Sequence, residues 1–427
     1  MEDGRPEAPR SPNVLIVTDV GFPHGTGASS RIFNYARGMQ AAGARVRVLS
    51  VESPSSASSL NTVVRGEYRG VPFEYTSGRT TRAPSFLERR ALNLAKGPRF
   101  ALAALRWAAS AGGLDAVLVY SRSPGWIALA WVGCRLHGAA LLHEDCELPF
   151  VWRHETVSTA LQRWLYERIV FKAFDGCLVI SKYLDAYCRR HLRPGDRTLL
   201  VPILVDVDDV ATEEEVAAAP RDRVAYCGYM DHREMRSVVD AFAAVAPEFP
   251  ELRLQLIGGW LQPARKPALL ARLRELGLSD RVDLTGKVSR EELFALLRDA
   301  RVHLLPRATA SFSDAGLPTK VAEYLASGRP VVVTAVGDLP RYLTDGSDVY
   351  FAQSDDADAF AARLRDALEH PGEAAEVGRR GRETAKLRFD PATHGGRIVA
   401  FIDGLRRPRR REWSLPSDSA GPTGGGP

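Results

Sequence analysis

The sequence lacks several features that would place it in a special class of protein. It has five cysteines, an odd number without a CxxC pair, so it predicts neither a disulfide framework nor a zinc site and is compatible with a reducing cytoplasm. No apolar run reaches the roughly 18 residues of a membrane-spanning helix, because Arg135 and His137 interrupt the most apolar segment, 126–142. Residues 1–11 are acidic and rich in proline where a signal peptide would be basic and then apolar, so we expect a flexible leader.

The sequence also lacks a strong excess of charge of one sign. Its net charge is +5, but five arginines and two acidic residues beyond residue 405 account for three of these charges and leave +2 on the rest of the chain. A nucleic-acid-binding protein needs a basic face over much of its domain. We therefore expect no nucleic-acid partner, although the Arg-rich segment beyond residue 405 could contact anionic lipid.

Short apolar segments recur along the chain and predict its fold. Helical patterns separate most of these segments, which lie at 14–18, 45–50, 116–120, 140–144, 177–181, 199–204, 224–228, 252–258, 282–286, 302–306, 330–334 and 349–352. Strands that are apolar throughout are typical of parallel sheets covered by helices on both faces. The sequence therefore predicts an α/β protein with two Rossmann-like doubly wound domains facing a cleft, where ligands bind at the carboxyl ends of the strands.

Composition also predicts where the domains begin and end. The acidic segment 207–223 ends in Ala and Pro and is typical of an exposed linker. We expect an N-terminal domain at 12–206, a C-terminal domain at 224–390 and a last helix at 391–407. The segment 408–427 is too poor in apolar residues to bury a core and should be disordered.

A short helix in the second half carries the clearest candidate site. Pro318 suits the first position of a helix of about ten residues, and Gly328 suits the position beyond its end. Lys320 and Glu323 are three residues apart and share one face of this helix. Three loop residues offer backbone N–H groups for an anion: Gly316, Leu317 and Thr319. An ordinary capped helix with a solvated Lys/Glu pair explains the spacing equally well.

The first half contains a Gly-rich candidate loop. Gly25 and Gly27 permit close approach of the backbone to a ligand before the next helix begins. With Glu52 as a ribose-binding acid, the same segment matches the start of a dinucleotide fingerprint, so a nicotinamide-dependent oxidoreductase remains an alternative. A plain flexible loop is a third interpretation.

His143 and Glu144 end a strand on the side of the expected cleft. They could orient the hydroxyl groups of a sugar or an acceptor, although a histidine near a strand end is more often structural.

Residues 79–106 include seven lysines and arginines in an Ala/Leu-rich segment that also contains Phe86 and Phe100. Such a basic amphipathic segment could lie on an anionic membrane, which predicts peripheral membrane contact. A solvated helix face is the commoner explanation.

Several motifs together resemble a known family. The run 316–346 is similar to the donor-site signature of the retaining GT-B glycosyltransferases of group 1, also called family-four transferases. Further segments resemble parts of this family in the family's order: 25–50 (first Gly-rich loop and helix), 143–149 (acceptor-side loop), 177–184 (segment near the hinge), 227–242 (donor-phosphate loop) and 282–306 (connecting strand, helix and strand). The resemblance covers residues 12–405.

The resemblance implies an enzyme that moves a sugar from a nucleoside-diphosphate donor to an acceptor hydroxyl with retention of configuration, without a metal or other cofactor. Such transfers serve glycan, glycolipid or natural-product biosynthesis. The second domain would hold the donor and the first domain the acceptor. Glu323 matches the second of the family's paired Glu residues, which holds the ribose hydroxyls. The first Glu, which contacts the transferred sugar, falls at Ala315 with Asp314 beside it, so either Asp314 substitutes, sugar recognition differs or activity is weak.

The donor-phosphate loop also departs from the family pattern. After Gly228 the family's arginine falls at Tyr229, so Arg233 or Arg236 would supply the cation for the leaving diphosphate, and Arg236 matches better. Together with Ala315, this departure leaves open a non-catalytic partner subunit that keeps the fold.

Overall fold

The computed structural model describes residues 11–25, 27–52, 60–148, 156–218, 222–230, 234–309 and 311–405. The expected tail at 408–427, the expected leader apart from Ser11, and the candidate residue Arg233 lie outside the described residues.

The first sheet has eight strands in the order β3-β4-β2-β1-β5-β6-β7-β8. Their bounds are β1 (Asn13–Thr18), β2 (Arg45–Ser50), β3 (Arg65–Tyr68), β4 (Val71–Tyr75), β5 (Ala116–Tyr120), β6 (Ala140–Asp145), β7 (Gly176–Val179) and β8 (Arg197–Leu200). All neighbours pair in parallel except β3 and β4. Leu15 and Val17 of β1 pack in one core and Val14 and Ile16 in another, so both faces of this strand are buried.

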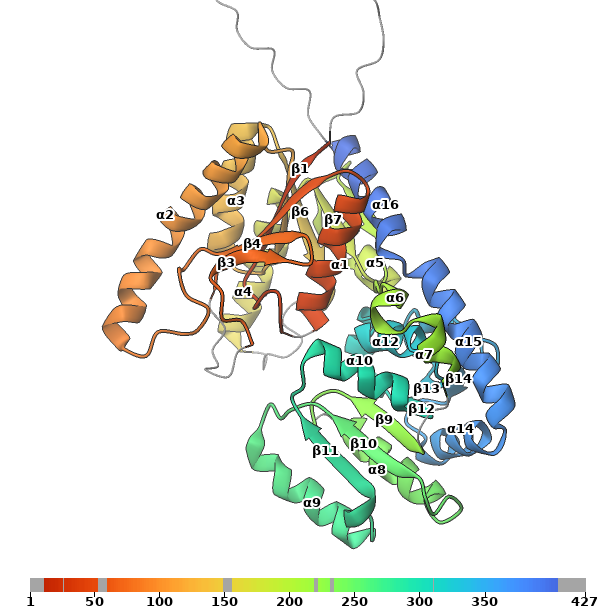
Figure 1. Ribbon diagram of the computed structural model, residues 1–427. Coiled ribbons are helices and arrows are strands. Elements are labelled where there is room, and N and C mark those ends of the chain that lie inside the picture. Colours follow the sequence, from red (N-terminus) through yellow and green to blue (C-terminus); the bar gives the residue numbers. More distant parts are fainter. Residues whose placement is uncertain are drawn as a thin grey trace, which may run out of the picture.

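The second sheet has six parallel strands in the order β11-β10-β9-β12-β13-β14. Their bounds are β9 (Arg223–Cys227), β10 (Arg253–Ile257), β11 (Val282–Gly286), β12 (Val302–Leu305), β13 (Val331–Thr334) and β14 (Tyr350–Ala352). The prediction of two doubly wound parallel α/β domains is therefore confirmed (Figure 1).

The described helices connect the strands and cover both sheets. In the first half they are α1 (Gly27–Ala41), α2 (Phe86–Ala111), α3 (Pro124–His137), α4 (Val157–Arg168) and α5 (Lys182–His191). The chain then passes through α6 (Val207–Val210) and α7 (Glu213–Ala217). The remaining helices are α8 (Glu234–Val245), α9 (Lys266–Glu275), α10 (Arg290–Asp299), α11 (Ser311–Ala315), α12 (Thr319–Ala326), α13 (Leu339–Tyr342), α14 (Ala357–Glu369), α15 (Pro371–Arg388) and α16 (Pro391–Leu405). None of these described helices is both long and apolar enough to cross a bilayer.

The hairpin β3–β4 is the part of the first sheet that the sequence prediction missed. Its two-residue turn consists of Arg69 and Gly70, whose φ angles are 48° and 85°. Positive φ at both central residues matches the twist of antiparallel strands, which is why such turns favour glycine. The sequence does indicate this hairpin, because polar and apolar residues alternate over 65–75 around that glycine. This alternation differs from the continuous apolar runs of the other strands.

The last helix returns to the first domain and packs on α1 (Figure 1). Contact is close because both helices present glycine: a Cβ on Gly395 would lie 1.9 Å from the carbonyl carbon of Gly38. Ile398 and Ile402 of α16 are fully buried in the core that also contains Val14 and Ile16. The first domain is therefore completed by residues from the end of the chain.

The two domains also meet through α5, at its N-terminal end. Ser181, the N-cap residue of α5, donates a hydrogen bond from Oγ to the carbonyl oxygen of Ala315 at 2.6 Å. The backbone N–H of Lys182 donates to Oδ2 of Asp338 at 2.7 Å. These bonds fix the end of α11 and the start of α13 against the first domain.

Candidate functional site

Glu323 lies on α12, where the two domains meet. Its Oε1 is 3.3 Å from Nη1 of Arg290, and its side chain is 14% exposed. Arg290 is the first residue of α10, whose start is fixed by a capping box between Ser289 and Glu292. The same Nη1 donates to Oγ of Ser30 in α1 at 2.5 Å. Arg290 therefore joins Glu323 to the first domain, and the sequence analysis did not identify it.

The environment of Glu323 opposes its ionisation only in part. Burial raises the pKa of Glu323 above its usual value, whereas the charges of Arg290 and Lys320 act in the opposite direction. A buried carboxylate beside two cations is a strong acceptor of hydrogen bonds from a ligand that displaces one of them.

Lys320 occupies the same face of α12, as predicted from the spacing. Its Nζ lies 3.3 Å from the hydroxyl of Tyr226 and 3.8 Å from Oε2 of Glu234. Tyr226 donates to the same carboxylate at 2.9 Å, and Nε of Arg307 lies 3.9 Å from it. The contacts of both cations with Glu234 are longer than a hydrogen bond, so an anionic ligand can compete for these charges.

Gly228 follows β9 and brings backbone close to Lys320. A Cβ at this position would lie 2.5 Å from Nζ of Lys320 and 2.8 Å from the hydroxyl of Tyr226, and its φ of 159° is one that side chains rarely allow. The neighbouring Gly258 is equally constrained, since its Cβ would lie 2.0 Å from the carbonyl oxygen of Gly228. Only glycine fits this approach of two loops at the carboxyl edge of the sheet.

Two helix N-termini meet between the domains. A Cβ on Gly27, the first residue of α1, would lie 2.6 Å from Oγ1 of Thr319, the first residue of α12. Gly316 is partly exposed and Leu317 is buried just before α12. Gly25 accommodates the Ser29 hydroxyl, which a Cβ there would approach to 2.2 Å. Both helix dipoles place positive potential at this junction, which favours an anion.

Helix α11 ends at Ala315, which stands where the family has its first Glu, with Asp314 beside it. Ala315 is fully buried, and its carbonyl oxygen accepts the bond from Ser181. Asp314 is partly exposed. Asp314 is thus the residue of this pair that a ligand can reach.

Arg236 does not lie with these groups, which corrects its assignment as the phosphate-binding cation. Its side chain is 83% exposed and pairs with Asp240 on the same helix at 3.5 Å. Two side chains that are two residues apart on a helix point about 200° apart around its axis. Because Glu234 points toward Lys320, Arg236 points away from it. Arg307, two residues after β12, supplies a cation beside Glu234 instead. Its position just beyond the carboxyl end of a predicted strand was the available signal.

His143 is enclosed in the core of the first domain, which argues against its expected role in orienting hydroxyl groups. Its ring is 1% exposed, stacks on Phe174 with centroids 4.6 Å apart, and contacts the Tyr166 hydroxyl through Nε2 and the carbonyl oxygen of Val119 through Nδ1. Burial lowers the pKa of His143 to about 4. Both ring nitrogens are occupied, and the ring is neutral near pH 7.

Glu144 is also engaged inside the first domain. It is buried and forms an ion pair with Arg31 of α1, which further donates to the carbonyl oxygens of Val201 and Pro202. Glu144 therefore ties β6 and α1 to the end of β8, which argues against the expectation that it orients acceptor hydroxyls.

Other polar groups of the first domain do lie at the carboxyl edge of its sheet. Oδ2 of Asp19, directly after β1, accepts a hydrogen bond from Ser121 after β5 at 2.6 Å. Burial raises the pKa of Asp19, and the charge of Glu52 adds to this effect. These residues followed predicted strands in the sequence but matched no motif.

The Gly-rich loop is unlike a dinucleotide-binding turn. Strand β1 ends at Thr18 and α1 begins at Gly27, so residues 19–26 separate the two elements. The fingerprint requires a tight turn from strand to helix. Glu52, the expected ribose-binding acid, forms an ion pair with Lys96 of α2. In the parts of the chain that the structure describes, no three His, Cys, Asp or Glu side chains gather as a metal site would require.

Two family models match the chain, one in each half. The model described as "Glycosyl transferase 4-like domain" matches residues 26–203. The model described as "Glycosyl transferases group 1" matches residues 221–370. The first match lies in the half of the chain that forms the eight-stranded sheet, and the second lies in the half that forms the six-stranded sheet.

Individual relatives agree with these models. The chain is 28% identical over 172 residues to the mannosylfructose-phosphate synthase of Agrobacterium fabrum, a stretch that covers 39% of this chain and 37% of that protein. The matched stretches span 30–37% of the lengths of three such curated relatives. Sucrose-phosphate synthase from Thermosynechococcus elongatus has a TM-score of 0.69 at 21% identity over 92% of this chain and 100% of that one. Anabaena HepE in complex with UDP and glucose has a TM-score of 0.67 at 16% identity over 91% and 99%.

Proposed function

The chain belongs to the group 1 glycosyltransferases and has the GT-B fold of two Rossmann-like domains, and we propose that it transfers a sugar from a nucleoside-diphosphate donor to an acceptor hydroxyl. The observation that carries this proposal is the placement of Glu323 and Lys320 on one face of α12 beside the Gly228 loop. The likeness to HepE, solved with UDP and glucose, makes UDP the first nucleotide to test.

Glu323 would bind the ribose of the nucleotide. A carboxylate accepts hydrogen bonds from two vicinal hydroxyls at once, and a ribose offers such a pair. The ion pair with Arg290 holds the carboxylate in place before the nucleotide arrives. Asp314, the partly exposed acid near the end of α11, would contact the transferred sugar in place of the family's first Glu.

Lys320, Arg307 and the N-terminus of α12 would stabilise the leaving diphosphate. The acceptor oxygen bonds to the anomeric carbon while the bond from that carbon to the β-phosphate oxygen breaks. The acceptor proton passes to a phosphate oxygen, and the products are a glycoside and a nucleoside diphosphate. Cations fixed beside the phosphates stabilise the charge that develops there. Attack on the face that the diphosphate leaves retains configuration, and NMR of the product anomer would measure this.

Calorimetric titration of UDP, GDP, ADP and TDP into the intact chain tests the proposal. We expect one nucleotide to bind and Glu323→Gln to weaken it by about tenfold or more, because hydrogen bonds to a charged group contribute about 1.5–3 kcal/mol. Glu291→Gln, which changes an exposed acid next to Arg290, is the matched control and should bind normally. Failure of all four nucleotides to bind would favour a non-catalytic partner subunit.

We also propose that the first domain contacts a membrane surface through α2, α3 and α4. These helices and the residue after α4 carry large exposed apolar side chains: Phe86, Leu87, Leu94, Leu102, Leu105, Leu129, Trp131, Val132, Leu136, Val157, Leu161, Trp164, Leu165 and Ile169. In the described part of the second sheet's domain, residues 222–390, the comparable side chains are Leu261 and Leu387. Apolar surface of this extent on one domain is typical of an interaction site.

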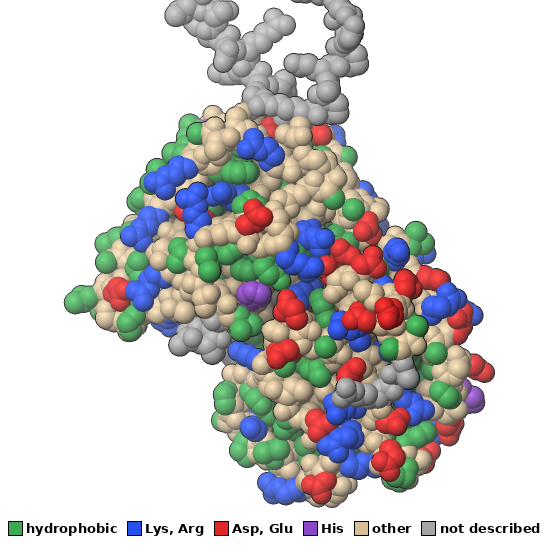
Figure 2. Space-filling model, in the orientation of Figure 1, with side chains coloured by type: hydrophobic (Ala, Val, Ile, Leu, Met, Phe, Trp, Pro, Cys, Tyr) green, Lys and Arg blue, Asp and Glu red, His purple; other side chains and the backbone are tan. Residues whose placement is uncertain are grey.

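Charge supports an anionic bilayer as the occupant of this apolar surface. Arg90, Arg106 and Arg168 are exposed on α2 and α4, and Figure 2 shows basic and apolar side chains interspersed over the outer face of α2. The acid on α2, Glu88, is already paired with Arg79. Basic residues near a membrane surface contribute roughly 1 kcal/mol each to binding of anionic lipid.

Sedimentation with vesicles of phosphatidylcholine, with and without phosphatidylglycerol, tests the membrane contact. We expect binding only to the anionic vesicles, and Leu94→Gln should reduce it severalfold because that side chain is 83% exposed on α2. Leu387→Gln removes an equally exposed apolar side chain from the other domain and should change nothing. Equal losses in the two variants would contradict the assignment of the surface.

A further inference from the structure

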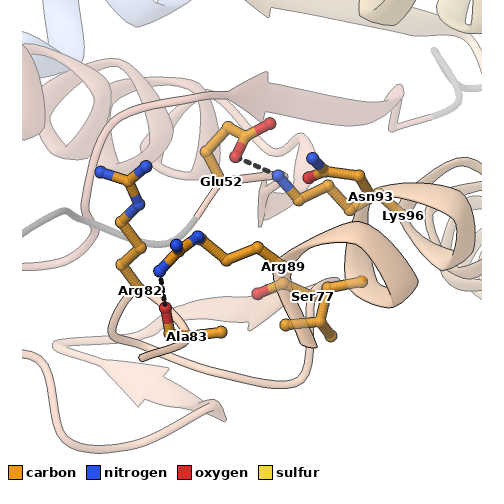
Figure 3. A pocket seen from close by; sticks show the side chains of 8 residues that line it. Glu52, Ser77, Arg82, Ala83, Arg89, Asn93 and Lys96 are labelled. Atoms are coloured by element: carbon orange, nitrogen blue, oxygen red, sulfur yellow. Dashed lines mark hydrogen bonds and ion pairs between the residues drawn. The ribbon is translucent and has the colours of Figure 1, made fainter. Parts of the chain in front are cut away.

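A pocket of about 330 Å³ opens in the first domain, apart from Glu323 and Lys320. We call it the α2 pocket, and the lining residues that matter here are Glu52, Ser77, Arg82, Arg89, Asn93 and Lys96 (Figure 3). Arg89, Asn93 and Lys96 recur at spacings of four and three along α2, so one face of the helix forms one wall. The other walls come from segments that follow β2 and β4.

The α2 pocket lies at the carboxyl edge of the first sheet. Strands β2 and β4 run parallel, so the segments after Ser50 and after Tyr75 leave the sheet at the same edge. Asp19, after β1, lies at this edge too, and its pKa is raised in part by the charge of Glu52. In open α/β sheets ligands bind beyond the carboxyl ends of the strands. The pocket is therefore on the side of the first domain where an acceptor would bind.

The charge of the α2 pocket is positive. Arg82, Arg89 and Lys96 contribute three cations, and Glu52 contributes one carboxylate, which pairs with Lys96. Arg89 is held in place because Nη1 donates to the carbonyl oxygens of Ala83 and Pro84, at 3.0 and 2.7 Å. These bonds fix its guanidinium before any ligand binds, which lowers the ordering cost of binding.

Arg82 supplies the cation of the α2 pocket that has no partner among the described residues. Within the described ranges its guanidinium makes no hydrogen bond or ion pair, whereas the nearby Arg79 and Arg99 are engaged by Glu88 and by the carbonyl oxygen of Ser77. Figure 3 shows Arg82 and Arg89 reaching the pocket from the loop and from α2, with Glu52 and Lys96 joined by their ion pair. Guanidinium groups match the paired oxygens of phosphate and carboxylate groups.

We propose that the α2 pocket binds a phosphate group carried by the acceptor, so that the preferred acceptor is a phosphorylated molecule. This inference rests on the proposed transferase function, which assigns the donor diphosphate to the second domain and leaves these cations without a role in donor binding. Arg82 and Arg89 contact the phosphate, and Lys96 contributes charge from beside Glu52. The phosphate belongs to a soluble sugar phosphate or to an isoprenyl phosphate, two sources with the same charged group.

Calorimetry tests the proposal on the chain saturated with the nucleoside diphosphate that it binds, because this nucleotide occupies the other phosphate-binding site. The probes are glucose 6-phosphate with glucose as its neutral partner, and farnesyl phosphate with farnesol. We expect one phosphorylated probe to bind and its neutral partner not to, and Arg82→Gln to weaken that binding about tenfold. Arg82 is exposed and makes no described contact, so this variant should fold, as circular dichroism can verify. Arg190→Gln removes an exposed cation from α5 of the same domain and is the matched control.

The possible outcomes distinguish the two sources of the phosphate group from each other and from a failure of the proposal. Preference for glucose 6-phosphate identifies a soluble acceptor, and preference for farnesyl phosphate identifies a lipid-borne one, provided that Arg82→Gln weakens binding and Arg190→Gln does not. Equal effects of the two variants, or no preference for phosphorylated probes, overturns the proposal. Failure of UDP, GDP, ADP and TDP alike to bind would count against the transferase function instead, and the comparison of the two arginine variants without nucleotide would still report on the α2 pocket.

Discussion

Arg290 forms an ion pair with Glu323, with Nη1 and Oε1 3.3 Å apart, and the same nitrogen donates to the hydroxyl of Ser30 in the other domain. One guanidinium thus links the carboxylate proposed for nucleotide binding to α1. A ribose bound at Oε1 would compete with Arg290, so the proposed nucleotide binding would be coupled to the contact between the domains through this pair.

Nucleotide binding should depend on the ionisation of Glu323. Burial raises the pKa of this carboxyl, so the ionised form that accepts both ribose hydroxyls is complete only above that raised value and is lost as the pH falls through it. Arg290→Gln removes a charge that lowers this pKa, so the midpoint of binding should move to higher pH. Titration of UDP across a pH series measures the midpoint. Glu291→Gln serves as control, and an unchanged midpoint in Arg290→Gln would contradict the assignment.

Arg307 and Arg236 make opposite predictions for the phosphate site. The Arg307 side chain is 16% exposed and lies beside Glu234, the first residue of α8. The Arg236 side chain, on the same helix, is 83% exposed and points away from Glu234. Arg307→Gln should weaken UDP binding about tenfold, because it removes a charge-assisted contact to the diphosphate. Arg236→Gln should bind UDP as the unchanged chain does. The reverse ranking in calorimetry would restore Arg236 as the phosphate-binding residue.

The fold was more predictable from the sequence than the contacts of the site. Buried parallel strands can be recognised in the local sequence, because the residues on both of their faces must be apolar. The hairpin that turns at Arg69 and Gly70 was missed because its apolar and polar residues alternate. Glu323 and Lys320 share one helix, so their common face also follows from spacing. Arg290 and Arg307 come from other elements and reach the site only through the topology of the sheet.

The positions of His143 and Glu144 differ from the expectation for one physical reason. His143 and Glu144 were placed by where their strand ends, but the end of a strand does not fix which layer its side chains enter. In the structure both are buried, His143 against Phe174 and Glu144 against Arg31. Whether a side chain at the end of a strand reaches the ligand depends on which helices cover that strand. The local sequence does not contain this information.

His143 should make the fold sensitive to acid. The pKa of His143 is lowered to about 4 by burial, so below its ordinary value near 6.5 the unfolded chain takes up the proton first and stability falls as the pH decreases toward 4. This loss should be about 2 kcal/mol between about pH 8 and about pH 5. Urea unfolding of His143→Gln should show a pH-dependent loss smaller by that amount. His370→Gln removes an exposed histidine whose pKa is raised by its hydrogen bond to the Asp366 backbone, so it should not make this loss smaller.

Gly395 should be required for the last helix to complete the first domain. A Cβ at this position would lie 1.9 and 2.0 Å from the carbonyl carbon and oxygen of Gly38, and backbone atoms in α1 cannot move aside without separating the helices. Gly395→Ala should therefore lower stability by about 1–3 kcal/mol. The adjacent Gly396 has no atom within 4 Å of such a Cβ, so Gly396→Ala should be neutral or slightly stabilising, since alanine favours a helix by roughly 0.5–1 kcal/mol over glycine.

Thermal unfolding of the two glycine variants separates close packing from helix propensity. A mechanism based on propensity predicts that both alanines stabilise, whereas packing predicts that only Gly395→Ala destabilises. Because α16 also carries Ile398 and Ile402 into the core of the first sheet, loosening it should expose apolar surface there. If Gly395→Ala were as stable as Gly396→Ala, α16 would not rest on α1 at this distance, and the first domain would not depend on the end of the chain for its core.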